Sequence, residues 1–332
     1  MERIGKIRQW LAKRFPGRAF ELAPASADAS FRRYLRVSFA DGETHIVMDA
    51  PPLHEDVRPW LQVQRLFAAA GVQVPEVLAQ DLERGFLLIT DLGSTTYLSA
   101  LEAGADADSL YRAALDTLID IQRASRPGVL PAYDRALLER ELDLFPDWYL
   151  ARHLAVDLDA NERNALRAVF DVILAVNLAE PSVFVHRDYH SRNLMVTNGR
   201  PGVIDFQDAV FGPITYDLVS LFKDAYVEWP EEQTIDWLAR YWEKAKKTGL
   251  PVRDDFGEFF RDYEWMGVQR HLKVLGIFAR LKHRDGKGAY LENMPLVMRH
   301  LRRTCERYAR LAPLLRLLDK LENRQIQLGY TF

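Results

Sequence analysis

The spacing of apolar residues predicts two kinds of region along the chain. Near the start, apolar side chains come in short runs or alternate with polar ones, which is typical of β-strands. Five such runs lie at residues 19–22, 31–39, 44–48, 77–79 and 86–89. Asp41-Gly42, between the second and third runs, is a common hairpin turn. The pattern therefore predicts a five-stranded sheet.

Later in the chain, apolar residues recur every three to four positions, which predicts amphipathic helices. Asp134 and Asp159 stand where helix caps are expected. The predicted helices are 2–14, 57–70, 108–125, 134–153, 159–179, 216–227, 231–248, 254–280, 295–312 and 313–323. We expect an α+β fold with two lobes: a β-rich nucleotide-binding lobe at 1–92, with one helix inserted after its third strand, and a helical lobe at 93–332.

Composition narrows the class of protein. The 332 residues are 48% hydrophobic and 27% charged, as in globular proteins, and the net charge of -3 gives no reason to expect a nucleic acid or membrane partner. No obligate protein partner is evident. Cys305 is the only cysteine, which excludes an internal disulfide and a cysteine-based metal cluster. The start does not resemble a signal peptide, and no stretch has the roughly 18 apolar residues of a membrane span. We expect a cytoplasmic protein.

The motif with the clearest chemistry follows an apolar run at 183–185. It reads His186-Arg187-Asp188, with Asn193 five residues after Asp188, and then Asp205-Phe206 after two further apolar runs. Asp188 by itself is equally well explained as a solvated loop carboxylate. A carboxylate, an amide and a second carboxylate at this spacing serve phosphoryl transfer. The pattern predicts that Asp188 accepts the proton of the attacking hydroxyl, while Asn193 and Asp205 hold Mg²⁺ beside the phosphates of ATP.

Residues near this motif are candidates for binding the acceptor substrate. They are His190, Arg192, Asp208 and Arg270. If the acceptor is anionic, an arginine is expected to bind it, and Arg187, Arg192 and Arg270 are not ranked by the sequence. Asp217 is expected to brace the catalytic loop by accepting backbone N–H groups.

The sequence signals for nucleotide binding are weaker than those for the motif around Asp188. The small-residue segment 23–30 lies where a phosphate-covering loop is expected, but it has no glycine. Ser30, Arg32 and Arg33 are candidates for the phosphates, and alternation along a strand allows only one of the two arginines to face them. Adenine is expected at a hinge formed by Ile89, Asp91 and Leu92.

No lysine occurs between Lys13 and Lys223, so the third-strand lysine of the wider kinase pattern is missing. Either an arginine replaces it, or Mg²⁺ and backbone donors suffice.

Together these motifs resemble the aminoglycoside phosphotransferase-like branch of the protein-kinase-like fold, over nearly the whole chain. Segments 30–36, 47–52 and 205–209 are similar to the sugar kinases of peptidoglycan recycling. The resemblance implies ATP-dependent phosphorylation of the anomeric hydroxyl of N-acetylmuramate or N-acetylglucosamine. It also implies that Asp188 is the base and that Asn193 and Asp205 are the magnesium ligands.

Two alternatives remain open. A related small-molecule kinase would act on an aminoglycoside, choline or another amino alcohol, and a cationic substrate predicts a strongly acidic pocket. The acids available for one are Asp224, Glu228, Glu231 and Glu232, and they alternate with aromatic residues. A protein of another class would be a non-catalytic nucleotide-binding pseudokinase, but Asp188, Asn193 and Asp205 are all present. Trp229, Trp237, Trp242 and Trp265 are available to stack on a sugar, although helical spacing favours a core role.

Overall fold

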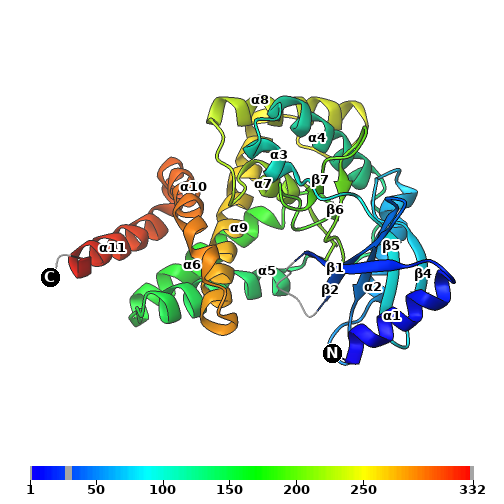
Figure 1. Cartoon of the computed structure of the whole chain (residues 1–332). Coiled ribbons are helices and arrows are strands. Elements are labelled where there is room, and N and C mark those ends of the chain that lie inside the picture. The colour runs from blue at the N-terminus through cyan, green and yellow to red at the C-terminus, as the bar shows by residue number, and fades with distance from the viewer. Residues whose placement is uncertain (1, 27–31, 330–332) are drawn as a thin grey trace. The chain divides into compact units, whose positions relative to one another are not determined.

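The computed structural model describes residues 2–26 and 32–329, and it divides into two compact units (Figure 1). The first comprises Met1–Ala105 and Asn193–Asp208, and the second comprises Asp106–Arg192 and Ala209–Phe332. The first unit thus takes in a short segment from the middle of the chain. The predicted functional division after residue 92 stays a prediction.

The first unit contains the predicted five-stranded sheet. Its strands are β1 Phe20–Ser26, β2 Arg33–Phe39, β3 Thr44–Asp49, β4 Val77–Asp81 and β5 Phe86–Thr90. The order is β1-β2-β3-β5-β4, and all neighbours are antiparallel. In this register Arg33 lies opposite Asp49, and Ile46 lies opposite Ile89. The sheet and the helix inserted after its third strand are confirmed.

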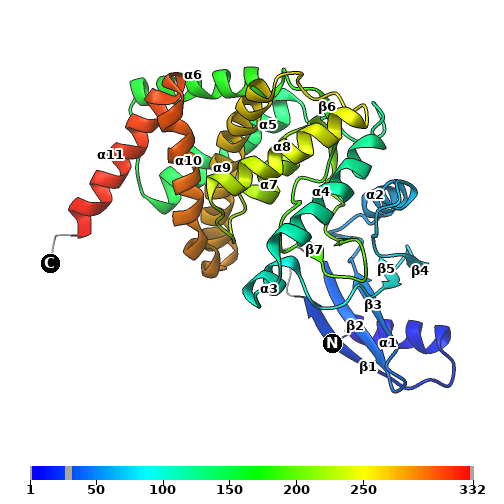
Figure 2. The ribbon, with the colours of Figure 1, turned by 90° about the horizontal axis from the view of Figure 1, so that it is seen from above.

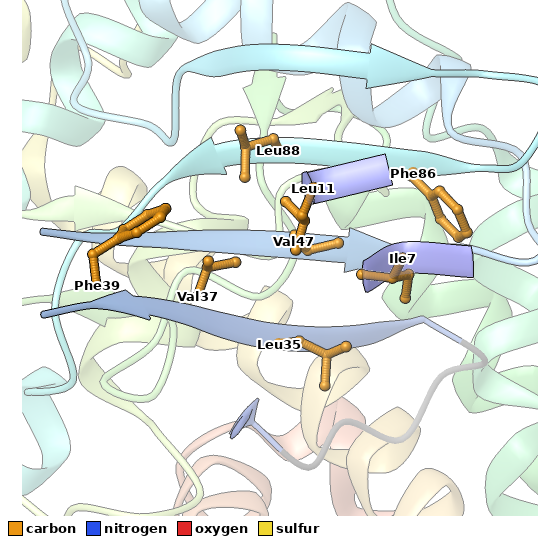
Figure 3. Close-up of a cluster of buried hydrophobic side chains, with 8 residues drawn as sticks. All are labelled: Ile7, Leu11, Leu35, Val37, Phe39, Val47, Phe86 and Leu88. Atoms are coloured by element: carbon orange, nitrogen blue, oxygen red, sulfur yellow. The ribbon is translucent and has the colours of Figure 1, made fainter. Parts of the chain in front are cut away.

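Helix α1, Glu2–Arg14, covers one face of this sheet (Figure 3). Ile7 and Leu11 are four residues apart and lie on one side of the helix, where both are fully buried. They pack with alternate residues of three strands: Leu35, Val37, Phe39, Val47, Phe86 and Leu88. Apolar residues spaced four apart in the helix and two apart in the strands therefore pack together in one core.

The segment Asn193–Asp208 belongs to the first unit because of local contacts. It forms a hairpin of β7 Leu194–Met195 and β8 Gly202–Val203. Phe206, fully buried, packs against Trp60 and Phe67 of α2, Arg58–Ala69, with ring centroids 5.1 and 5.9 Å apart. The N–H of Val203 also donates to the carbonyl of Gln73 at 2.8 Å. A short helix that the sequence did not predict, α3 Tyr97–Glu102, precedes the second unit.

The second unit is mainly helical. Its helices are α4 Ala107–Arg123, α5 Arg135–Leu142, α6 Ala160–Asn177, α7 Tyr216–Phe222, α8 Glu231–Lys247, α9 Phe256–Asp285, α10 Met294–Arg307 and α11 Ala312–Gly329. A π-helical segment, η1 Phe145–His153, and two 3₁₀ segments, η2 Gly288–Asn293 and η3 Ala309–Leu311, complete the helical set. Helix α9 is 30 residues long and packs against η1, α10, α7 and α6 (Figure 2). Strands β6 Ser182–Val185 and β9 Val210–Pro213 form an antiparallel pair.

Some predicted boundaries are wrong. The single helix expected at 134–153 is broken after Leu142, and Pro146 lies in the first turn of the π-helical segment, where its missing N–H needs no partner. The helix expected to reach residue 227 ends at Phe222, and the one expected to reach 312 ends at Arg307. The caps are confirmed, since Asp134 accepts from the N–H of Leu137. Asp159 forms a capping box with Glu162.

The four tryptophans that were considered for stacking on a sugar lie in the packed interior or at its margin. Trp237 and Trp265 are buried. Trp229 donates its indole N–H to the hydroxyl of Tyr111 at 2.8 Å, and Trp242 donates to the carbonyl of Arg253 at 2.7 Å. The core role favoured by helical spacing is therefore confirmed for Trp237 and Trp265. Within the part of the chain that the structure describes, no helix is long and apolar enough to cross a membrane.

Candidate active site

The loop that carries the candidate base Asp188 begins where β6 ends, and it belongs to the second unit. Val183, Phe184 and Val185 are buried, which fixes the start of the loop in the core. His186 is fully buried, and its Nδ1 accepts the backbone N–H of Asp188 at 3.2 Å. The apolar run and the histidine thus place Asp188 at the edge of the unit, with its side chain 41% exposed.

Asp217, in the first turn of α7, braces this loop as expected. Its two carboxylate oxygens accept the backbone N–H groups of His186 and Arg187 at 2.7 and 3.0 Å. Complete burial raises the pKa of Asp217 to about 7, although the two N–H donors act in the opposite direction. The carboxyl group therefore satisfies two successive backbone donors that would otherwise be buried without partners.

Arg187, directly before Asp188, has a left-handed backbone with φ of +78°. This conformation is uncommon for residues other than glycine and needs support from its surroundings. The carbonyl of Arg187 accepts from Nη1 of Arg270 at 2.7 Å and from the hydroxyl of Ser220 at 3.2 Å. Its guanidinium is paired with the carboxylate of Glu141. The strained residue is thus fixed at its N–H, its carbonyl and its side chain.

Cations surround the carboxylate of Asp188. Nη2 of Arg270 lies 3.6 Å from Oδ1 of Asp188. Burial alone would raise the pKa of Asp188, but the charges of Lys273 and Arg270, with smaller effects from His190 and Arg187, hold that pKa well below its usual range. The carboxylate therefore stays ionised throughout the neutral pH range.

Behind the loop lies a buried ionic network that the sequence did not predict. Glu141 of α5 lies 3.0 Å from Nζ of Lys273, accepts from Nε2 of Gln269 at 3.1 Å and also accepts from the hydroxyl of Tyr133. Lys273 donates to the hydroxyl of Tyr216 at 2.9 Å. Burial would raise the pKa of Glu141, but Lys273 and Arg187 lower it to about 2. The sequence signal that could have indicated this network was the presence of charged residues such as Lys273 among the apolar residues of the long helix α9.

Asn193 and Asp205, the predicted magnesium ligands, lie side by side in the first unit. Nδ2 of Asn193 is 3.4 Å from Oδ2 of Asp205, and the N–H of Ile204 donates to the carbonyl of Asn193 at 3.1 Å. Asp205 has a left-handed backbone with φ of +62°, and its Oδ1 accepts from Nε2 of Gln207 at 2.8 Å. A half-turn of the Asn193 amide directs its oxygen toward the carboxylate. Two hard oxygen donors this close fit a Mg²⁺ ion that takes its other ligands from phosphates and water.

The predicted phosphate-binding residues are placed differently from one another. Ser30 lies outside the described residues. Arg33 is on the sheet face that α1 covers, where its Nε donates to Oδ2 of Asp49 at 3.1 Å and Arg3 of α1 donates to Oδ1 at 2.9 Å. Nε of Arg32 is 3.8 Å from a carboxylate oxygen of Glu55. Asp49 is fully buried, so it ties Arg33 to the α1 side of the sheet.

The hinge residues are fixed by contacts within the first unit. Ile89 is buried in β5. Asp91 accepts from Nε and Nη2 of Arg36 at 2.6 and 3.0 Å, and from the N–H of Gly93 at 2.9 Å. Leu92 packs against Gly202, where an added Cβ would lie 2.9 Å from Leu92 Cδ1. The pair between Arg36 and Asp91 was not predicted, because both residues looked like isolated charges in the sequence.

The acceptor candidates are divided between the units. His190, Arg192 and Arg270 are in the second unit, whereas Asp208 is exposed in the first and accepts from Gln207 at 3.2 Å. The structure brings Arg192 and His190 together through a residue that the sequence did not single out, Tyr226. The guanidinium of Arg192 is 3.9 Å from the Tyr226 ring centroid, and the His190 ring is 5.6 Å from it.

Solved structures of similar fold include a kinase-family protein and an aminoglycoside phosphotransferase. A choline/ethanolamine kinase family protein from Mesorhizobium loti has a TM-score of 0.63 at 17% identity, covering 94% of this chain and 99% of its own. The aminoglycoside phosphotransferase APH(2'')-Ib, with ADP bound, has a TM-score of 0.60 at 14% identity, covering 89% and 97%. The predicted protein-kinase-like fold is confirmed.

Relatives found by sequence have a much higher identity to this chain than these structures have. A protein of Neisseria meningitidis serogroup B named N-acetylmuramate/N-acetylglucosamine kinase is 50% identical over 336 residues, covering the whole of both chains. One of the same name from Pseudomonas aeruginosa is 54% identical over 301 residues, covering 91% of this chain and 88% of its own. Residues 21–256 match the phosphotransferase enzyme family (APH). The chain therefore belongs to the phosphotransferase enzyme family, as the sequence predicted.

Proposed function

We propose that this protein is an ATP-dependent sugar kinase that phosphorylates the anomeric hydroxyl of N-acetylmuramate and N-acetylglucosamine in cell-wall recycling. The observation that carries the proposal is 50% identity over the full length of a relative with that named activity. The motif residues Asp188, Asn193 and Asp205 are all present. We further propose that the protein works in the cytoplasm, where ATP is available.

In this proposal Asp188 accepts a hydrogen bond from the anomeric hydroxyl and then its proton. An anomeric hydroxyl is more acidic than other sugar hydroxyls, so an ionised carboxylate of low pKa suffices as the acceptor. Phosphoryl transfer needs little covalent assistance from the protein, and positioning supplies most of the rate. The rigid support of Arg187 by Asp217 and Arg270 is consistent with such a positioning role.

Asn193 and Asp205 would hold Mg²⁺, which neutralises charge on the ATP phosphates when bound. The position of Arg33 on the α1 side, bound to Asp49, favours Arg32 over Arg33 as the cation for the phosphates. We keep Ser30 in the proposal as a phosphate contact. At the hinge, Ile89 and Leu92 would line the adenine site. Because the carboxylate of Asp91 is bound to Arg36, Asp91 would contribute backbone groups.

Three of the four acids that a cationic acceptor would require, Asp224, Glu228 and Glu231, are engaged elsewhere. Asp224 is buried and accepts from the N–H of Ser191 at 3.0 Å. Glu228 is 2.8 Å from Arg299, and Glu231 is 2.6 Å from Arg307. These pairs weaken the alternative of an aminoglycoside or amino-alcohol kinase.

The test is a phosphate-transfer assay with four acceptors: N-acetylmuramate, N-acetylglucosamine, kanamycin and choline. We expect turnover with the two sugars and a product whose phosphate is on the anomeric oxygen, detectable by ³¹P NMR coupling to H1. Asp188→Asn is the matched control, because it keeps the size of the side chain but removes its charge. A preference for kanamycin or choline would favour the amino-alcohol alternative. ATP binding without transfer to any of the four would favour the pseudokinase.

A further inference from the structure

The two proposed acceptor sugars differ in one charged group. N-acetylmuramate carries a lactyl ether with a carboxylate, whereas N-acetylglucosamine has a hydroxyl at the same position. A protein that binds the carboxylate is expected to use an arginine, because the planar guanidinium can donate two parallel hydrogen bonds to it. Three arginines lie on or beside the catalytic loop, and the structure separates them.

The guanidinium of Arg187 is already paired within the protein. Its guanidinium pairs with Glu141 and lies 5.6 Å from the ring of Tyr133, and the side chain is 19% exposed. Withdrawing it would leave the buried Glu141 with one cation fewer and would remove one of the contacts that support the left-handed backbone before Asp188. Such a residue supports the loop and does not bind substrate.

Arg270 is also committed. It donates to the carbonyl of Arg187 at 2.7 Å and to the hydroxyl of Tyr216 at 3.2 Å, and its side chain is 7% exposed. Its second terminal nitrogen faces Asp188 at 3.6 Å. A ligand carboxylate at Arg270 would therefore compete directly with the base for the same cation.

Arg192 is different, because it is exposed and its guanidinium lies over the ring of Tyr226 at 3.9 Å. No carboxylate among the described residues forms an ion pair with it. Stacking on an aromatic ring holds the guanidinium plane while its edge keeps the N–H donors available to a ligand. Arg192 thus combines fixed orientation with unused hydrogen-bond donors.

The position of Tyr226 is coupled to the catalytic loop through Asp224. One oxygen of this buried carboxylate accepts the N–H of Ser191 at 3.0 Å, and the other accepts the N–H of Tyr226 at 3.2 Å. The ring of His190 is 5.6 Å from Tyr226, and the N–H of His190 donates to the carbonyl of Asp188 at 3.0 Å. Arg192 is four positions after Asp188, so their Cα atoms are at most about 14 Å apart. A hexose ring with its lactyl substituent fits within the reach of both side chains.

We propose that Arg192, held over Tyr226, binds the lactyl carboxylate of N-acetylmuramate and sets the preference between the two sugars. This inference rests on the proposed function. N-acetylglucosamine has no carboxylate for Arg192 to bind, so it serves as an internal control in every experiment. The binding is present in the ground state and the transition state alike, so its loss raises KM and leaves kcat nearly unchanged.

The experiment measures kcat and KM for both sugars in the wild type, Arg192→Ala and Arg192→Lys. For Arg192→Ala we expect kcat/KM for N-acetylmuramate to fall about ten- to a hundred-fold, the usual effect of losing charge-assisted hydrogen bonds. The value for N-acetylglucosamine should stay within about three-fold. Arg192→Lys should give an intermediate loss, because it keeps the charge without the paired donors. The KM for N-acetylmuramate alone should rise with ionic strength.

Three further variants separate recognition of the carboxylate from support of the protein structure. Arg163→Ala removes an exposed arginine on α6 that pairs with Asp157. It should leave kcat/KM unchanged for both sugars. Tyr226→Ala should lower the ratio of kcat/KM for N-acetylmuramate to that for N-acetylglucosamine, as Arg192→Ala does. Tyr226→Phe keeps the aromatic ring, so this ratio should stay near the wild-type value. An equal effect of Arg192→Ala on both sugars, or no effect on N-acetylmuramate, would overturn the inference.

The failure of this inference is distinguishable from failure of the proposed function. If the wild type phosphorylates neither sugar, the proposed function itself is wrong. If it phosphorylates both and the ratio of kcat/KM values is unchanged in Arg192→Ala, only the role of Arg192 is wrong.

Discussion

The two aspartates of the motif have contrasting surroundings. Asp188, in the second unit, is faced by Arg270 at 3.6 Å and is influenced by Lys273, so its pKa is held low. Asp205, in the first unit, lies against the amides of Asn193 and Gln207 at 3.4 and 2.8 Å. Cations near the carboxylate of Asp188 keep it ionised, whereas the two amides orient the carboxylate of Asp205. In the proposed function the first carboxylate would accept a proton and the second would bind Mg²⁺.

Both sites also contain a left-handed residue that is not glycine, but in different positions. At the first it is Arg187, the residue before the aspartate, and at the second it is Asp205 itself. Asp217, Ser220 and Arg270 bind the backbone of Arg187. The strain of each, of order 1–3 kcal/mol, persists because surrounding contacts over-determine the conformation. The orientation of the carboxylate is thus set by the backbone in both cases.

The largest effect is expected from removing the charge at the first aspartate. Asp188→Asn should lower kcat about a thousand-fold with either sugar, because the amide cannot accept the proton of the hydroxyl. ATP affinity, measured by calorimetry, should stay near the wild-type value. Turnover within ten-fold of the wild type, roughly, would show that Asp188 is not the base.

A large effect on nucleotide binding is expected from the second aspartate. Asp205→Ala should weaken ATP binding roughly a hundred-fold in the presence of Mg²⁺ and have little effect in its absence. The measurement is a pair of ATP titrations, with Mg²⁺ and with EDTA. Asp208→Ala is the matched control, since Asp208 is an exposed acid on the same segment. If both variants keep the same Mg²⁺ dependence as the wild type, Asp205 does not hold the metal.

A smaller effect, on pH dependence, is expected from weakening the cationic surroundings of Asp188. Lys273→Met removes a charge that lowers the pKa of Asp188, so that pKa should rise. If Asp188 is the base, activity requires the ionised carboxylate and is lost as pH falls through its pKa. The acid limb of the kcat/KM profile, which lies below pH 4 in the wild type, should therefore move to higher pH, and it is measured with N-acetylglucosamine from the lowest pH at which both proteins stay folded.

The same variant should lose about 3 kcal/mol of stability, because Glu141 stays buried with one cation fewer. The double variant Glu141→Gln, Lys273→Met serves as the control. It should recover part of the stability but keep the shifted acid limb. An acid limb that does not move in either variant would mean that Lys273 stabilises the fold without tuning Asp188.

Much of the fold followed from local pattern. Alternation in the first part of the chain predicted all five strands, and the helix inserted after the third strand was confirmed. Asp217 was predicted to brace the loop because it follows a turn and opens a helix, and both its N–H donors are observed. The break after Leu142 was missed, because the apolar period continues through Pro146 although the hydrogen-bond pattern changes.

The residues that tune the candidate site were harder to predict. Arg36 and Asp91 are 55 positions apart, and Arg187 and Glu141 are 46 apart. Nothing in the local sequence distinguishes such pairs from surface charges. Nothing in the sequence distinguishes Tyr226 among the 13 tyrosines of the chain. Its contacts with Arg192 and His190 are seen only in the structure.

The strands, most helices and the order of the chemical groups could be predicted from the chain, because they depend on residues that are close together in it. The partners of the charged groups became known only from the folded protein. Arg187 and Arg270 are bound within the protein, and Arg33 is bound to Asp49, whereas Arg192 lies exposed over an aromatic ring. Whether a charge is available to a ligand depends on which distant residues the packing brings beside it, and local sequence does not contain that information.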